Sequence, residues 1–254
     1  MSELTLVRNL ALIGIGVTLL ANPSHAEVTF DGTLGPGGTL SGNFDIPDSY
    51  GKQVGANLFH SFSTFNIDTG ESATFTSSFA GVTDNVIGRI TGGSLSTIDG
   101  LLASTIPGAA IWLINPNGIV FGDNASLSVP GAFHVSTADY LLLEDGGRFD
   151  ATNLGATVLT MANPVTFGFL SATPMPISVG ASTLDLEPDA DISFVGGDIT
   201  LTDTTINAPG GRVNLASAAS AGELGLEAGG IGVNGVTNFG DINLTTANVE
   251  TTSD

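Results

Sequence analysis

Four acidic residues at alternate positions form the clearest row of possible metal ligands in the sequence. They are Asp185, Glu187, Asp189 and Asp191, and alternate residues of an extended segment share one face. Carboxylate oxygens in such a row could bind Ca²⁺. Because Pro188 interrupts the segment and no calcium-loop motif surrounds it, we favour a solvated outer face. Neither a metal site nor a cofactor is expected.

Residues that could serve an enzyme are present but are poorly organised. His134, Ser136 and Asp139 could be a hydrolase triad, yet no nucleophile elbow exists, and the first two alternate with apolar residues as on an outward strand face. Residues 230–235 match GxGxxG, but no helix follows, which predicts a turn rather than a dinucleotide site. His60 lies among phenylalanines and is expected to be packed or to cap a neighbouring group. We expect no catalytic residues.

The tetrapeptide Asn115-Pro116-Asn117-Gly118 is the sharpest local signal, and it predicts a tight corner between two short apolar strands. Asn115 can bond its own backbone as an Asx turn, and Pro116 presets φ at the second turn position. Asn117 and Gly118 tolerate left-handed φ. On physical grounds alone, a structural corner is the favoured interpretation.

Composition limits the elements that could position these residues. The 254-residue chain holds 35 Gly, five Lys+Arg and 25 Asp+Glu, with a net charge of −20. One Lys, four Arg, eight Glu and one Gln are too few long polar residues to cover the outer faces of helices. The charge excludes nucleic acid as a partner, since phosphates would be repelled. An all-β fold of short strands and Gly-rich turns is therefore expected.

An internal repeat favours a solenoid over a β-sandwich. Residues 197–202 recur as residues 240–245, and we interpret the 43-residue offset as two periods, with the related residues 211–215 between them. A period of 21 to 22 residues with three strands per turn fits a parallel β-helix. Leu113, Ile119, Phe121 and Val135 are expected to point into its column.

Two segments should depart from this pattern. Residues 163–179 hold three prolines and two phenylalanines, Phe167 and Phe169, and predict an extra-helical hairpin that packs these rings on the outside of the solenoid. The C-terminal coils should run from about residue 180, and the polar tail, residues 245–254, is expected to fray.

The first 26 residues resemble a secretory signal peptide. Arg8 precedes a 12-residue apolar run, residues 10–21, and Ser24-His25-Ala26 forms a small-x-small cleavage site. The run is too short for a spanning helix, so no stable membrane insertion is expected. The remaining residues, 27–254, should form one exported β-helical domain without cysteine.

The order of several segments resembles the N-terminal secretion domain of filamentous-haemagglutinin-type exoproteins, the exported partner of two-partner secretion. The resemblance covers residues 28–223 and rests on residues 57–67, 85–93, 98–100 and 111–119. The family's Asn-Pro-Asn-Gly-Ile motif falls on Asn115, Pro116, Asn117, Gly118 and Ile119. A second family motif, Asn-Pro-Asn-Leu, is missing, which indicates the subgroup without it.

The resemblance implies a fold and a partner. The fold would be a right-handed parallel β-helix with an N-terminal cap at residues 28–67, closed by Phe30, Phe44, Phe59, Phe62 and Phe65. Asn57 and Asn66 would belong to this cap region. The partner would be an outer-membrane translocator that recognises the chain through periplasmic POTRA domains. The protein would reach the surface or exterior of a Gram-negative-type bacterium, with an adhesin-related role and with host or cell-surface receptors as further partners.

Two other functions stay open at this stage. Polysaccharide lyases share the β-helix and combine clustered acids with a basic residue, so a secreted polysaccharide-acting enzyme is one alternative. The other is a truncated remnant of a longer exoprotein.

Overall fold

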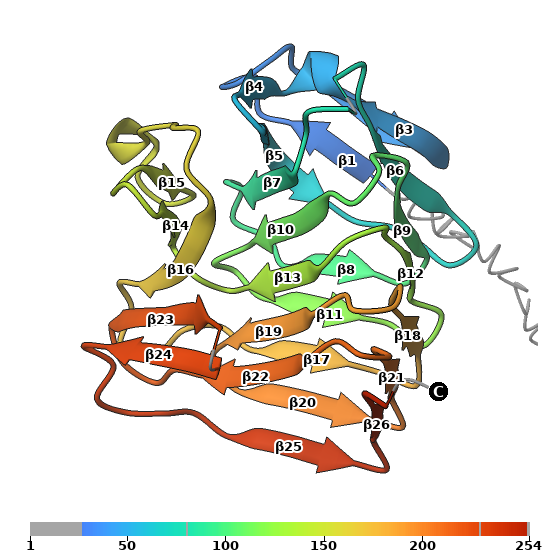
Figure 1. Cartoon of the computed structure of the whole chain (residues 1–254), viewed down its shortest axis with the longest axis vertical. Helices are drawn as coiled ribbons and strands as arrows, with labels where there is room; N and C mark the ends of the chain where they lie inside the picture. The colour runs from blue at the N-terminus through green and yellow to red at the C-terminus, as the bar shows by residue number, and fades with distance from the viewer. Residues whose placement is uncertain (1–26, 80, 229, 253–254) are drawn as a thin grey trace, which may run out of the picture.

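Short strands follow one another around three faces of a column, and an antiparallel sheet flanks one of these faces (Figure 1). The computed structural model describes residues 27–79, 81–228 and 230–252. The expected signal peptide, residues 1–26, lies outside the described residues.

The first face carries the longest sheet of the described chain, in the order β2-β1-β5-β7-β10-β13-β19-β22, with β4 paired to β5. Its strands are β1 (Glu27–Phe30), β2 (Gly38–Ser41), β4 (Lys52–Val54), β5 (Asn57–Phe65), β7 (Asn85–Ile90), β10 (Ala110–Ile114), β13 (Phe133–Ser136), β19 (Ile192–Gly196) and β22 (Val213–Ser217). From β5 onward every pair is parallel, whereas β1, β2 and β4 pair antiparallel. The expected N-terminal cap is thus confirmed.

The other two faces close the column. The second face has the order β25-β20-β17-β11-β8, from β8 (Ser96–Ile98), β11 (Ile119–Phe121), β17 (Ile177–Val179), β20 (Ile199–Thr202) and β25 (Ile242–Thr245). The third face joins β12-β9-β6-β3 to β18-β21-β26. Its strands are β3 (Asn43–Pro47), β6 (Ser72–Thr76), β9 (Leu101–Ser104), β12 (Ser126–Ser128), β18 (Thr183–Asp185), β21 (Thr205–Asn207) and β26 (Asn248–Glu250). A short 3-10 helix, η1 (Asp48–Tyr50), connects β3 to β4.

The flanking sheet has the order β15-β14-β16-β23-β24 and is antiparallel throughout. It consists of β14 (Tyr140–Leu143), β15 (Arg148–Asp150), β16 (Pro164–Phe169), β23 (Gly222–Glu227) and β24 (Gly230–Asn234), with η2 (Leu154–Ala156) after β15. In Figure 1 it lies beside the first face.

Two apolar cores follow from this arrangement. The column core contains Leu113, Ile119, Phe121 and Val135, as the alternation predicts. The second core lies between the outer side of the first face and the flanking sheet. Strands such as β7 are therefore buried on both sides.

The extra-helical excursion is confirmed, but its extent differs from the prediction. It begins at β14 rather than at residue 163, and the β23–β24 hairpin joins it from a later coil. Phe167 and Phe169 pack against the outer side of the solenoid and are completely buried there. The three prolines marked only the end of an insertion that apolar strands had begun.

The repeat was found correctly but interpreted wrongly. Coils repeat every 21 to 22 residues where no insertion intervenes, since Ile111 pairs with Phe133 and Ile192 with Val213. However, Ile199 pairs directly with Ile242. The 43-residue offset is therefore one coil plus the β23–β24 insertion, and residues 211–215 lie on another face.

Two local predictions are wrong. Residues 230–234 of the GxGxxG match form strand β24 instead of a turn, because they pair with β23 and complete the flanking sheet. The tail does not fray from residue 245, since β26 pairs in parallel with β21 through Glu250. Alternating Thr, Asn and Val suffice for an exposed strand when a neighbouring edge is available.

Candidate recognition site

The Asn-Pro-Asn-Gly motif turns the chain from β10 on the first face to β11 on the second. Asn115 is fully buried, and its Oδ1 accepts the Asn117 N–H at 2.9 Å, which is the predicted Asx turn. The Gly118 N–H donates to the Asn115 carbonyl at 3.2 Å. Gly118 has φ of 107°, so the left-handed conformation falls on the glycine.

Both asparagine side chains bind the preceding coil. Asn115 Nδ2 donates to the Ser94 carbonyl at 3.1 Å and to Ser96 Oγ at 3.0 Å. Asn117 Nδ2 donates to the Gly92 carbonyl at 2.6 Å. These bonds fix the corner loop of one coil on the corner loop of the coil before it, and they satisfy carbonyls that would otherwise be left unpaired.

The cap residues divide between the two cores. Phe62 and Phe65 lie in the column core, where their rings meet edge to face at 5.1 Å, and Phe30 packs on Phe62. Phe59 points the other way, into the second core, and contacts Phe149. The prediction that Phe59 closes the column is wrong, because it alternates with the inward residues of β5.

Asn57 is buried and joins the cap to the flanking excursion. Its Nδ2 donates to the carbonyls of Thr160 and Ala162 at 3.2 and 2.7 Å. Its Oδ1 accepts from Asn85 Nδ2, and Asn85 Oδ1 accepts from Trp112 Nε1. This chain of hydrogen bonds crosses three coils, and the sequence alone gave no sign of it.

Asn66 has a similar but more local role. Its Oδ1 accepts the Thr97 N–H at 2.9 Å and so connects two successive coils.

Arg89 is a buried cation between the column and the flanking excursion. Only 2% of its surface is exposed, and it donates to Ser61 Oγ, the Asp150 carbonyl, Thr157 Oγ1 and Thr33 Oγ1. Burial lowers the pKa of Arg89. A buried charge must be fully hydrogen-bonded to be tolerated, so this network ties β7, the loop after β1 and the excursion together.

The two described histidines are buried and electrically neutral. His60 lies in the column among Phe30, Phe62 and Phe75, and neither ring nitrogen has a hydrogen-bond partner. Burial lowers its pKa to about 4. His134 stacks on Trp112, and burial likewise lowers its pKa to about 4.

The hydrolase triad finds no support in the geometry. His134 Nδ1 lies 2.9 Å from Ser193 Oγ. Ser136 Oγ accepts the Ala138 N–H, and the Asp139 carboxylate accepts the Leu170 N–H. His134 and Ser136 do point away from the column, but they are buried beneath the flanking sheet rather than exposed.

The acidic row occupies an exposed edge near β18. Asp185, Glu187 and Asp189 are exposed, while Asp191 pairs with Arg212 at 2.8 Å. In the part of the chain that the structure describes, no group of three or more His, Asp or Glu side chains is arranged to hold a metal ion.

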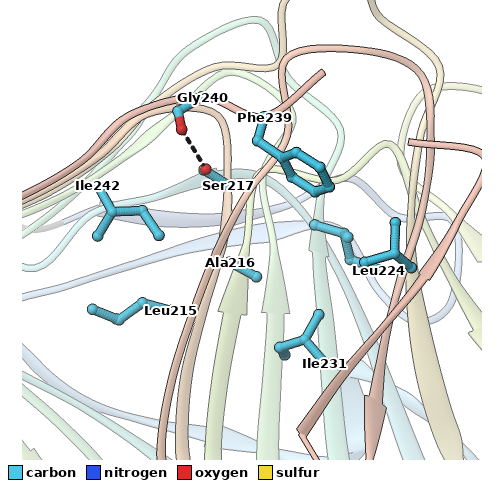
Figure 2. A pocket seen from close by; sticks show the side chains of 9 residues that line it. Leu215, Ala216, Ser217, Leu224, Ile231, Phe239, Gly240 and Ile242 are labelled. Atoms are coloured by element: carbon cyan, nitrogen blue, oxygen red, sulfur yellow. Dashed lines mark hydrogen bonds between the residues drawn. The ribbon is translucent and has the colours of Figure 1, made fainter. Parts of the chain in front are cut away.

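An apolar pocket of about 480 Å³ opens at the edge of β22, the last strand of the first face (Figure 2). Leu215 and Ile242 line its column side, and Leu224 and Ile231 come from the flanking sheet. Ser217 Oγ donates to the Gly240 carbonyl at 2.7 Å. None of the nine lining residues is ionisable, so the pocket offers apolar contact and no acid–base chemistry.

The fold and these sites define a class of protein: a three-sided parallel β-solenoid with an antiparallel cap, a flanking sheet, and polar side chains that fasten one coil to the next. Within that class, the chain belongs to the TPS secretion domain family, whose model matches residues 26–254. It is therefore the two-partner secretion domain of a secreted exoprotein.

Among solved structures, the chain is similar to the HMW1 secretion domain from Haemophilus influenzae. The two are 21% identical with a TM-score of 0.49, and the match covers 85% of this chain and 48% of that chain. The chain thus spans about half the length of that structure. No curated protein matches the sequence. Over the described residues, no helix is long and apolar enough to span a membrane.

Proposed function

We propose that this domain is the part of its exoprotein that an outer-membrane translocator recognises, through POTRA domains in the periplasm. The family match over residues 26–254 carries the proposal. The Asn-Pro-Asn-Gly corner supports it, because this motif is common to the family resemblance and to a rigid surface turn. The exoprotein would then act at the cell surface or outside the cell, in an adhesin-related role with surface receptors as its targets.

The solenoid suits export of an unfolded chain. Successive strands of the first face pair with segments only 21 to 28 residues away outside the long excursion. Each coil can therefore fold on the previous one as it emerges, and folding propagates from the cap. Folding outside the membrane prevents the chain from sliding back through the translocator.

Substitutions in the corner motif test the proposal. Asn115→Ala and Asn117→Ala are co-expressed with the translocator of the same genome, and the amount of chain in the medium is compared with the thermal midpoint of the purified domain. Each substitution removes hydrogen bonds worth about 1 kcal/mol each, and we expect secretion to fall further than the midpoint shift explains.

Asn124→Ala is the matched control. Asn124 is an exposed turn asparagine that bonds Asp99 at a different corner. It should lose a little stability and keep normal secretion. If all three variants are secreted in proportion to their stability, the motif is only a structural corner.

A further inference from the structure

The side chains of the Asn-Pro-Asn-Gly motif are already engaged inside the domain. Asn115 is fully buried and bonded to the preceding coil, and the Asn117 amide is bonded to the Gly92 carbonyl. A partner that read these asparagines directly would first have to break the corner. The exposed groups that the motif holds in place are therefore the better candidates for recognition.

Two exposed apolar side chains flank the motif. A Cβ at Gly118 would lie 3.6 Å from Leu95 Cβ and 3.8 Å from Met175 Cβ, so the bare glycine lies between them. Leu95 is 47% exposed and Met175 is 45% exposed. Large apolar side chains that stay in water beside each other mark interaction sites more often than they stabilise a fold.

The backbone holds both residues firmly. The Met175 carbonyl accepts the Thr137 hydroxyl at 2.6 Å and the Gly197 N–H at 2.9 Å. Leu95 lies between Ser94, whose carbonyl accepts from Asn115, and Ser96, whose N–H donates to the Gly118 carbonyl. The patch is thus preorganised, which lowers the entropy cost of binding.

The patch is also uncharged on a strongly anionic molecule. Residues 91–97, 115–122 and 170–184 contain no Asp, Glu, Lys, Arg or His, although the chain carries a net charge of −20. A partner without a basic surface is repelled from most of the molecule but can approach this corner. The charge distribution therefore favours one docking face and an apolar, uncharged partner surface.

We propose that the translocator's periplasmic surface docks on this patch, with Leu95 and Met175 as the contact residues and the Asn-Pro-Asn-Gly turn as the support that holds them. This inference rests on the proposed function. It adds that recognition is apolar, and that the two asparagines act as positioning residues.

The test measures binding of the domain to purified full-length translocator in nanodiscs at 50 and 300 mM salt. The double variant Leu95→Ser/Met175→Ser should bind at least tenfold more weakly while its thermal midpoint stays within about 2 °C, because both side chains are exposed. Binding of the unaltered domain should change less than threefold between the two salt concentrations, since apolar contact is not screened.

The matched control is Val158→Ser/Met161→Ser, which removes two apolar side chains that are 59% and 71% exposed on the flanking excursion. It should bind like the unaltered domain. Equal binding by the Leu95/Met175 variant, equal weakening by the control, or a steep salt dependence would each overturn the apolar patch. If the unaltered domain neither binds the translocator nor is exported by it, the proposed function itself fails.

Discussion

His60 is the residue whose chemistry the fold constrains most. It is buried among three phenylalanine rings with both ring nitrogens unpaired, and its pKa is lowered to about 4. The unfolded chain has a histidine pKa near 6.5, so below that pH the unfolded state binds protons that the folded state excludes. The contribution of the neutral ring is complete above pH 6.5 and is lost as the pH falls toward 4.

The domain should therefore lose stability in mild acid. Urea unfolding at pH 7, 5.5 and 4.5 is expected to show a falling free energy of unfolding, with His60 and His134 each contributing up to ~3 kcal/mol. Asp48 faces His60 and opposes the effect slightly. His60→Phe should flatten the curve by about half, and an unchanged slope in that variant would show that His60 is not the group responsible.

At the scale of the element, each strand of the column has one inward and one outward side. β11 shows this over two adjacent residues, since Ile119 is completely buried in the column core and Val120 is half-buried on the opposite side. β11 pairs in parallel with β8 and β17, so its register fixes both orientations.

Ile119→Asp is expected to abolish folding. An unpaired carboxylate in the column costs several kcal/mol, which is most of the stability of a typical domain. Val120→Asp, one position along the same strand, should remain folded with native circular dichroism and a small loss of thermal midpoint. A soluble Ile119→Asp variant with native strand content would contradict the inward assignment.

The whole molecule combines local coil-to-coil contacts with a charge of −20 and no cysteine. Every column strand after the cap pairs with strands of neighbouring coils, so the solenoid can form progressively from its N-terminal end. The absence of cysteine leaves the chain free of cross-links during transit, and the negative charge keeps an unfolded chain soluble.

A disulfide between two coils should therefore block export. Thr183 and Thr205 are register partners on β18 and β21, and such partners lie close enough for a disulfide. We expect the oxidised Thr183→Cys/Thr205→Cys variant to accumulate in the periplasm, and a reducing medium to restore secretion. Each single cysteine variant serves as a control and should be secreted normally. Normal export of the oxidised pair would show that the chain does not cross unfolded.

The sequence by itself determined the fold class, the coil length and the inward residues. Each of these depends on local alternation and on turn residues such as those at 115–118, and nearest-neighbour coils make local patterns sufficient. The sequence likewise indicated that residues 163–179 leave the column, because prolines exclude them from a sheet interior.

The tertiary structure alone decided what covers the outer side of the first face. The flanking sheet joins β14–β16 to β23–β24, which are separated by several coils, and no local pattern encodes such a pairing. For that reason Phe59 was placed in the wrong core, β24 was taken for a turn and the 43-residue offset was counted as two coils. The buried positions of Asn57, Arg89 and His134 have the same cause: their partners come from the excursion, and only long-range packing brings it onto the column.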